Sequence, residues 1–129
     1  MHKQFLRIAF LLGALAVGLG AFGAHGLKAV INEKALMVFE TAVRYQFYHV
    51  FALIAVAIVY RDQKSGMTVW AGRLFIAGIV FFSGSLYLLT FFQYMGNLSY
   101  QWVGAITPVG GLFFIIGWLL LFFSQAGRT

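Results

Sequence analysis

Long uninterrupted runs of apolar residues alternate with short polar segments along this chain. Four runs stand out, over residues 8–24, 45–60, 74–92 and 103–123. About 20 apolar residues are needed to cross the roughly 30 Å hydrocarbon core of a bilayer. Inside lipid the backbone must satisfy its own hydrogen bonds, and runs without two-residue alternation favour helices over a closed barrel. The pattern therefore predicts an all-α membrane protein, a single domain over residues 1–129, with four transmembrane helices in a bundle over approximately residues 5–25, 38–60, 69–92 and 103–124.

The connections between the apolar runs differ in character. Residues 28–40 interleave charged and apolar side chains, which predicts a short amphipathic interfacial stretch between helices 1 and 2. Residues 61–68 (RDQKSGMT) are typical of a polar turn. Residues 93–102 carry no charge but include Tyr94, Tyr100 and Trp102, which are residue types that favour a membrane interface.

The composition excludes several classes of protein. Hydrophobic residues make up 62% of the chain and charged residues 9%, whereas a soluble domain has about 25% charged residues. The chain has no cysteine, which excludes disulfides, thiolate nucleophiles and cysteine-ligated clusters. The formal net charge is +6, but the basic residues are dispersed singly beside apolar runs, so we expect no nucleic-acid partner.

The distribution of basic residues predicts an orientation. Lysine and arginine are commoner in the cytoplasmic loops of membrane proteins. The predicted helices place six of these basic residues on one side of the membrane: Lys3, Arg7, Arg61, Lys64, Arg73 and Arg128. Three lie on the other side: Lys28, Lys34 and Arg44. This predicts a multi-pass protein of the cytoplasmic (inner) membrane with both termini in the cytoplasm.

The first apolar run has an alternative interpretation. Lys3 and Arg7, a short apolar core and then Ala21-Phe22-Gly23 resemble a cleavable signal peptide. Nothing downstream is typical of an exported soluble domain, so an uncleaved first helix is favoured.

Glycines in the first run match a dinucleotide-binding fingerprint, Gly18-x-Gly20-x-x-Gly23. That fingerprint requires a preceding strand and an acidic residue about 20 positions later in a βαβ unit. A membrane helix offers neither, so the match does not indicate a nucleotide.

Small residues instead recur at helical spacings and predict close helix packing. Ala9, Gly13, Ala16, Gly20 and Gly23 lie along one face of the first helix, and Ala14-x-x-x-Gly18 lies on a neighbouring face. Small residues let membrane helices approach closely. We expect the first helix to be the most closely packed, central to the bundle or to an oligomer, with Gly13, Gly20 and Gly23 at the contacts. Gly110-Gly111 and Gly117 offer a similar face in the fourth helix, and Gly111 is the packing residue expected there. Leucine at Gly13, Gly20 or Gly23 should then disrupt assembly.

The start of the fourth helix has two interpretations. Thr107 can cap a helix in which Pro108 takes the first position. Otherwise the helix begins near Gln101 and Pro108 kinks it. The first is slightly favoured.

Polar residues gather at one end of all four predicted helices, the end opposite the termini. Intramembrane polar residues are costly and often mark function. They can also simply hydrogen-bond between helices, which we weigh as the commoner role. The candidate polar site comprises His25, Glu40, Arg44, Tyr45, Gln46, His49, Ser83, Ser85 and Thr107.

Metal and catalytic chemistry have weak support. His25 and His49 are the histidines of the candidate site, but they lie 24 positions apart without a metal-ligand spacing. No nucleophile elbow or triad pattern accompanies them. We therefore expect no metal, no cofactor and no catalytic residue.

Four segments together resemble a known family: GAFGAHGLK (residues 20–28), TAVRYQFYH (41–49), FSGSLYLL (82–89) and ITPVGG (106–111). They are similar, in the same order, to the family catalogued as domain of unknown function 423. That family includes small bacterial inner-membrane proteins and the animal transmembrane protein 256, which is associated with mitochondria. The resemblance implies a four-helix membrane protein with an uncleaved first helix, and it implies no activity, cofactor or catalytic residue.

These observations favour a structural or accessory protein of the lipid bilayer, without enzymatic activity, that packs against copies of itself or a larger membrane complex. The alternative is a protein that binds or transports a small solute, an ion or a lipid headgroup at the candidate polar site. A membrane enzyme or redox helper is a third hypothesis, and it requires a prosthetic group or an active site at that end.

Overall fold

The computed structural model describes residues 1–127, without the side chains of Leu98 and Tyr100. Arg128 and the Tyr100 side chain therefore lie outside the described part of the chain. The elements, in order, are α1 (Lys3–Ala24), η1 (Leu27–Ala29), α2 (Glu33–Asp62), α3 (Gly66–Gly78), η2 (Ile79–Ser83), α4 (Gly84–Tyr94), η3 (Leu98–Ala105) and α5 (Thr107–Ala126).

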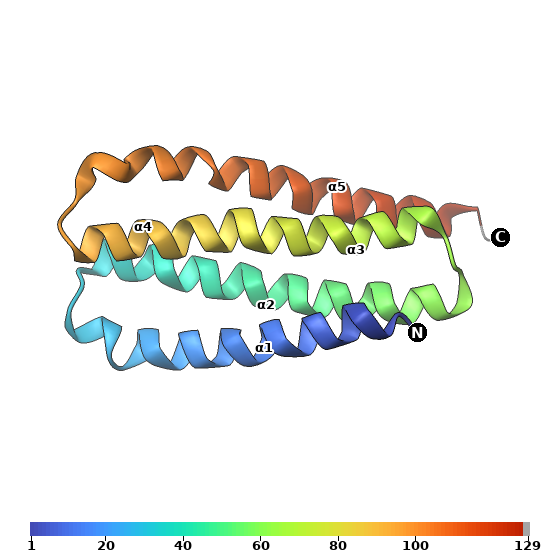
Figure 1. Cartoon of the computed structure of the whole chain (residues 1–129), viewed down its shortest axis with the longest axis horizontal. Coiled ribbons are helices and arrows are strands. Elements are labelled where there is room, and N and C mark those ends of the chain that lie inside the picture. Colours follow the sequence, from blue (N-terminus) through green and yellow to red (C-terminus); the bar gives the residue numbers. More distant parts are fainter. Residues whose placement is uncertain (128–129) are drawn as a thin grey trace.

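The predicted fold class is confirmed. Four helical spans, 3–29, 33–62, 66–94 and 101–126, are long and apolar enough to cross a membrane. They run up and down in chain order, and both ends of the chain lie at the same end of the bundle (Figure 1). We call this end the terminal end and the opposite one the loop end.

Side-chain caps set where the helices begin. His2 accepts a hydrogen bond from the Phe5 backbone at the start of α1. Asn32 accepts one from the Ala35 backbone at 2.8 Å, so α2 begins at Glu33. The predicted amphipathic stretch between helices 1 and 2 is consequently short. It comprises the 3₁₀ turn η1 and the residues up to Asn32, and its second half forms the first turns of α2.

The third span contains a turn that the sequence pattern did not predict. Between α3 and α4 the chain makes a π-helical turn over η2. At its end the hydroxyl of Ser83, fully buried, donates to the carbonyl of Ala42 in α2 at 2.7 Å. π-helical turns inside α-helices are uncommon and hold side chains in positions that a regular helix would not.

Both interpretations of Pro108 were right in part. α5 begins at Thr107 and Pro108 lies in its first turn, as favoured. Thr107 is not the cap, however, because Ile106 takes that position and the Thr107 hydroxyl bonds to Ser85 in α4. Helical turns do precede the proline, but they belong to the separate 3₁₀ segment η3.

The helices α2 and α3–α4 lie between two outer helices, α1 and α5 (Figure 1). α1 packs mainly on α2, and α5 mainly on α3. The apolar core lies where the inner helices meet, around Leu53, Val56 and Phe75, which are fully buried. In the 18-residue apolar stretch of each span, 44% of the residues of α2 are buried, but only 17% of the residues in the span that contains α1.

The expectation that the first helix is central and most closely packed in the bundle is therefore wrong. The predicted small-residue face does turn toward α2, but at Gly13 and Gly20 an added Cβ would lie an ordinary 3.5 Å from valine side chains. Gly23 approaches more closely, since its added Cβ would lie 2.7 Å from the ring of Phe39.

The closest approach between two backbones involves α5 instead. A Cβ on Gly110 would collide with the backbone of Phe82 in η2. Gly111, which belongs to the same predicted face, has the Phe82 ring only at 3.8 Å. Neighbouring glycines look alike in a sequence, but only Gly110 is turned toward η2.

Gly110→Ala should destabilise the fold by about 1–3 kcal/mol, because the backbone of η2 cannot move aside as a flexible side chain can. Gly84→Ala is the matched control, since no atom lies within 4 Å of its added Cβ. There alanine should be neutral or stabilise the helix by up to about 1 kcal/mol. Melting in mild detergent, followed by circular dichroism, measures both. Equal melting temperatures would contradict the assigned helix contact.

Candidate polar site within the membrane

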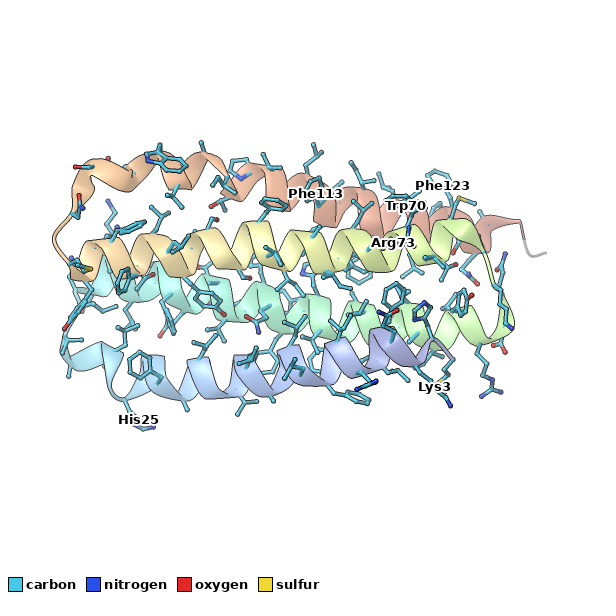
Figure 2. The ribbon with its side chains drawn as sticks, in the orientation of Figure 1. Lys3, His25, Trp70, Arg73, Phe113 and Phe123 are labelled. Atoms are coloured by element: carbon cyan, nitrogen blue, oxygen red, sulfur yellow. The ribbon has the colours of Figure 1, made fainter. Side chains whose placement is uncertain are left out.

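The predicted polar residues do not form one cluster. His25, Glu40, Arg44 and Tyr45 are exposed on the outside of the bundle, and His25 points away from it (Figure 2). Gln46, His49, Ser83 and Ser85 are buried. Within residues 1–127, His25, Glu40 and His49 therefore line no common cavity, because the turn of the helix carries them to different faces.

Gln46 joins three helices. Its side chain is 3% exposed, and its Nε2 donates to the carbonyl of Leu12 in α1 at 2.8 Å. The hydroxyl of Tyr87 in α4 donates to Gln46 Oε1 at 2.7 Å. One amide from α2 thus holds an outer helix and an inner helix at once.

Ser85 and Thr107 join α4 to the start of α5. Ser85 Oγ donates to the carbonyl of Phe82 at 2.8 Å, and it lies 2.5 Å from Thr107 Oγ1. Since the single hydroxyl hydrogen of Ser85 is used toward Phe82, Thr107 must be the donor in the second bond.

His49 lies near the middle of α2 and contacts α5. Its Nδ1 lies 2.8 Å from the carbonyl of Tyr45, and its Nε2 lies 3.1 Å from Nε1 of Trp118. Its ring stacks on Phe114 with 3.5 Å between centroids. The indole N–H only donates, so Nε2 must accept and Nδ1 must carry the hydrogen toward Tyr45. This geometry selects a neutral imidazole with one tautomer.

Trp118 and Tyr87 are the polar partners that the candidate list from the sequence lacks. Trp118 lies within the fourth apolar run, and by hydropathy alone it is indistinguishable from the apolar residues around it. Its signal was the indole N–H, which needs an acceptor in lipid, but a sequence does not say which helix supplies that acceptor.

A groove of about 550 Å³ borders His49 on the α5 side. Aromatic rings form most of its wall, and the polar atoms of His49 and Trp118 there already bond to each other. In the described part of the chain, no three histidine or acidic side chains are placed to hold a metal ion. His25 and His49 in particular do not converge, since one is exposed beyond α1 and the other faces α5.

Known proteins are similar to this chain over most of its length. The sequence model of a protein family of unknown function (DUF423) matches residues 19–111. The chain belongs to this family.

Relatives in the family cover nearly the whole chain and are named UPF0382 membrane proteins. One from Bacillus subtilis is 47% identical over 121 residues, which cover 92% of this chain and 93% of the relative. One from Staphylococcus haemolyticus is 44% identical over 122 residues, covering 95% and 94%. One from Staphylococcus saprophyticus is 46% identical over 119 residues, covering 92% and 93%. No solved structure matches the chain. The resemblance and the membrane class are thereby confirmed.

Gln46→Leu should destabilise the protein by about 1–3 kcal/mol, because the substitution leaves the Tyr87 hydroxyl without its partner and removes the bond from α2 to the Leu12 carbonyl. Glu40→Gln, one and a half turns earlier and exposed, should change stability by less than about 0.5 kcal/mol. Unfolding by denaturant in mild detergent measures both. If the two variants unfold alike, Gln46 does not hold the helices together.

Proposed function

We propose that this chain is an accessory integral membrane protein that acts by lateral helix packing, assembles with a second copy of itself and carries no catalytic activity of its own. The observation that supports this proposal is the exposed small-residue face of α1. This proposal goes beyond the family assignment, which shows only that the chain is a membrane protein of the DUF423 family.

The outer face of α1 is built for a close contact but has no partner within the chain. Ala14, Gly18 and Ala21 follow one another at spacings of four and three and are all exposed. No atom lies within 4 Å of a Cβ added to Gly18. Small residues at this spacing let two helix backbones approach closely in lipid, where van der Waals contact drives association.

A second copy is the partner that this face fits most simply. In a two-fold dimer the same patch faces itself, and a small-residue stripe is complementary to an identical stripe. α1 also lies at an edge of the bundle (Figure 1), so two copies can meet there without rearranging the other helices. Fully apolar side chains such as Leu11, Leu15 and Val17 flank the stripe and are exposed.

The alternative function, binding or transport of a small solute or ion at the predicted polar site, has less support. Its proposed lining residues His25 and Glu40 are exposed on the outside of the bundle. The buried members, Gln46 and His49, use their polar atoms to bond to other helices. Such pairing favours a structural role for them.

We further propose that the protein lies in the cytoplasmic membrane with its termini in the cytoplasm. The terminal end carries Lys3, Arg7, Arg61, Lys64 and Arg73, whereas the loop end carries Lys28, Lys34 and Arg44. Lys3 and Arg73 lie toward the terminal end in Figure 2. The Arg73 guanidinium lies 5.0 Å from the ring centre of Trp70, an arrangement typical of a membrane boundary.

Gly18→Leu should abolish the dimer in mild detergent, because the larger side chain separates the two α1 backbones. Light scattering coupled to size exclusion measures the protein mass. Gly84→Leu is the matched control, since its position is equally free of neighbours within 4 Å but lies on α4. A monomeric wild type, or a dimer that withstands Gly18→Leu, would rule out this interface.

Single cysteines test the orientation, because the natural chain has none. Ser65→Cys lies in the turn between α2 and α3 at the terminal end, and Asn97→Cys lies between α4 and η3 at the loop end. A membrane-impermeant maleimide added to intact cells should label Asn97→Cys and leave Ser65→Cys unlabelled until the cells are opened. The opposite labelling would invert the proposed topology.

A further inference from the structure

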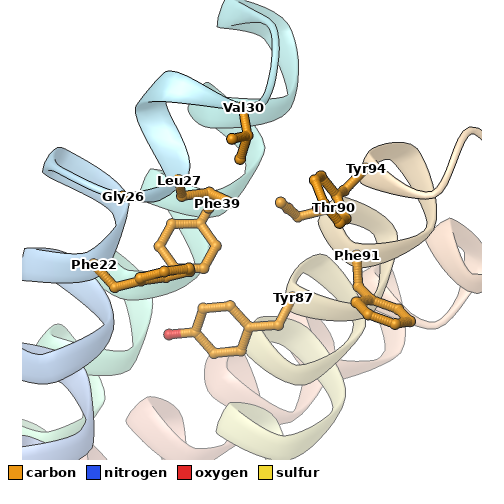
Figure 3. Close-up of a pocket in the computed structure, with 9 residues that line it drawn as sticks. All are labelled: Phe22, Gly26, Leu27, Val30, Phe39, Tyr87, Thr90, Phe91 and Tyr94. Atoms are coloured by element: carbon orange, nitrogen blue, oxygen red, sulfur yellow. The ribbon is translucent and has the colours of Figure 1, made fainter.

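A second groove, separate from the one beside His49, opens at the loop end of the bundle. It has a volume of about 450 Å³. Figure 3 shows Phe22 and Phe39 on one side, Thr90, Phe91 and Tyr94 on the other, and Tyr87 between them. The groove thus separates the end of α1 from α4, with α2 beneath.

The wall of this groove offers its contents almost no free hydrogen-bonding group. The Thr90 hydroxyl donates to the carbonyl of Leu86 in its own helix, and the Tyr87 hydroxyl donates to Gln46. The remaining contacts are aromatic rings and aliphatic side chains such as Leu27 and Val30. An apolar chain therefore fits this groove better than a polar solute.

A small polar cavity of about 140 Å³ adjoins the groove on the side of the loops. The two share Val30 and Tyr94 in their linings. Asn32 and Gln93 also line the small cavity. Gln93 Oε1 is buried and has no hydrogen-bond partner. A buried acceptor without a partner destabilises the fold, and a ligand that donates to it would recover that cost.

The polarity of the two spaces follows the membrane. Gln93 lies at the end of α4 and Asn32 just before α2, where two of the candidate spans end or begin. From Tyr94 to Tyr87 the groove extends seven helical positions toward the membrane centre, or about 10 Å at 1.5 Å per residue. Polar space at the boundary and apolar space below it match a lipid headgroup and its acyl chain.

We propose that this site binds one phospholipid of the surrounding bilayer. One acyl chain lies in the groove between α1 and α4, and the headgroup donates an N–H or O–H hydrogen bond to Gln93 Oε1. An acceptor at this position favours headgroups with a donor, such as phosphatidylethanolamine, over phosphatidylcholine, whose quaternary ammonium has no N–H. The proposal does not rest on the α1 dimer, because its observations are the groove and the unpaired Gln93 oxygen.

The test is native mass spectrometry of the full chain in mild detergent, with phosphatidylethanolamine and phosphatidylcholine of identical acyl chains added in equal amounts. The expected result is a one-lipid adduct in which phosphatidylethanolamine exceeds phosphatidylcholine by about 5-fold, the effect of one hydrogen bond. Phosphatidylglycerol, whose headgroup has hydroxyl donors, should also be preferred to phosphatidylcholine.

Two substitutions separate the parts of the site. Gln93→Leu should reduce the preference to about 1-fold while the adduct remains, because the apolar groove is intact. Val30→Trp should lower the adduct of both lipids at least several-fold by filling the space that the two cavities share. The matched controls are Gln101→Leu and Val109→Trp, which alter exposed side chains away from the groove.

Equal binding of the two lipids to the wild type, or a preference that persists in Gln93→Leu, would overturn the headgroup contact. Adducts that are undiminished in Val30→Trp would overturn the groove as the site of the acyl chain. Each variant's melting curve identifies loss of fold, and for any variant that melts early the adduct is measured in reconstituted nanodiscs at lower temperature.

Discussion

Hydrocarbon offers no hydrogen-bond partner, and this constraint decides how the polar residues of the protein are arranged. Every donor and acceptor inside the spans must bond within the protein or lie where it can reach the boundary. The buried side chains Gln46, His49, Ser83 and Ser85 follow this requirement, and each bonds to another residue. Because most of their partners lie on a different helix, the same bonds fix how the helices sit against one another.

α2 supplies most of these connections. Its Gln46 reaches α1 and α4, its His49 reaches Trp118 of α5, and the carbonyl of its Ala42 receives the Ser83 hydroxyl. α2 also has the most buried span. Four of the other helical elements, α1, η2, α4 and α5, are thus located by hydrogen bonds to one helix. Dispersion contacts at glycines also bring α5 against α3 and η2.

The sequence was sufficient for the fold because that depends on the lengths of the apolar runs, which any single substitution hardly changes. It was insufficient for the site because a hydrogen bond depends on rotation about each helix axis. Glu40 and Gln46 stand within two turns of each other, yet one is exposed and the other is 3% exposed. Periodicity groups residues on one face but does not say which face meets which helix. For the same reason the two small-residue faces of α1 could be recognised, but the inward one could not be told from the outward one.

The π-helical turn and Trp118 were beyond reach for a related reason. The turn at η2 is held by contacts from α2 and α5 rather than by a residue type within it, since Ser83 bonds to Ala42 and Gly110 lies against Phe82. A local pattern cannot reveal a conformation that distant segments impose. The indole of Trp118 likewise gains its meaning only from His49, 69 positions away.

Two buried side-chain oxygens in the described residues depart from the rule that every polar group is paired, and they differ instructively. Thr68 Oγ1 and Gln93 Oε1 both lack a partner. Thr68 is fully buried in the first turn of α3, whereas Gln93 lines a cavity that continues into an apolar groove. An unpaired oxygen enclosed by protein is only a cost to stability. An unpaired oxygen beside a space that lipid can enter is also a source of selectivity, because only a lipid with a donor removes that cost. In this protein, therefore, the place to look for recognition is the loop end of α4, where one acceptor is unpaired, rather than the centre of the bundle, where Gln46 and His49 already have partners.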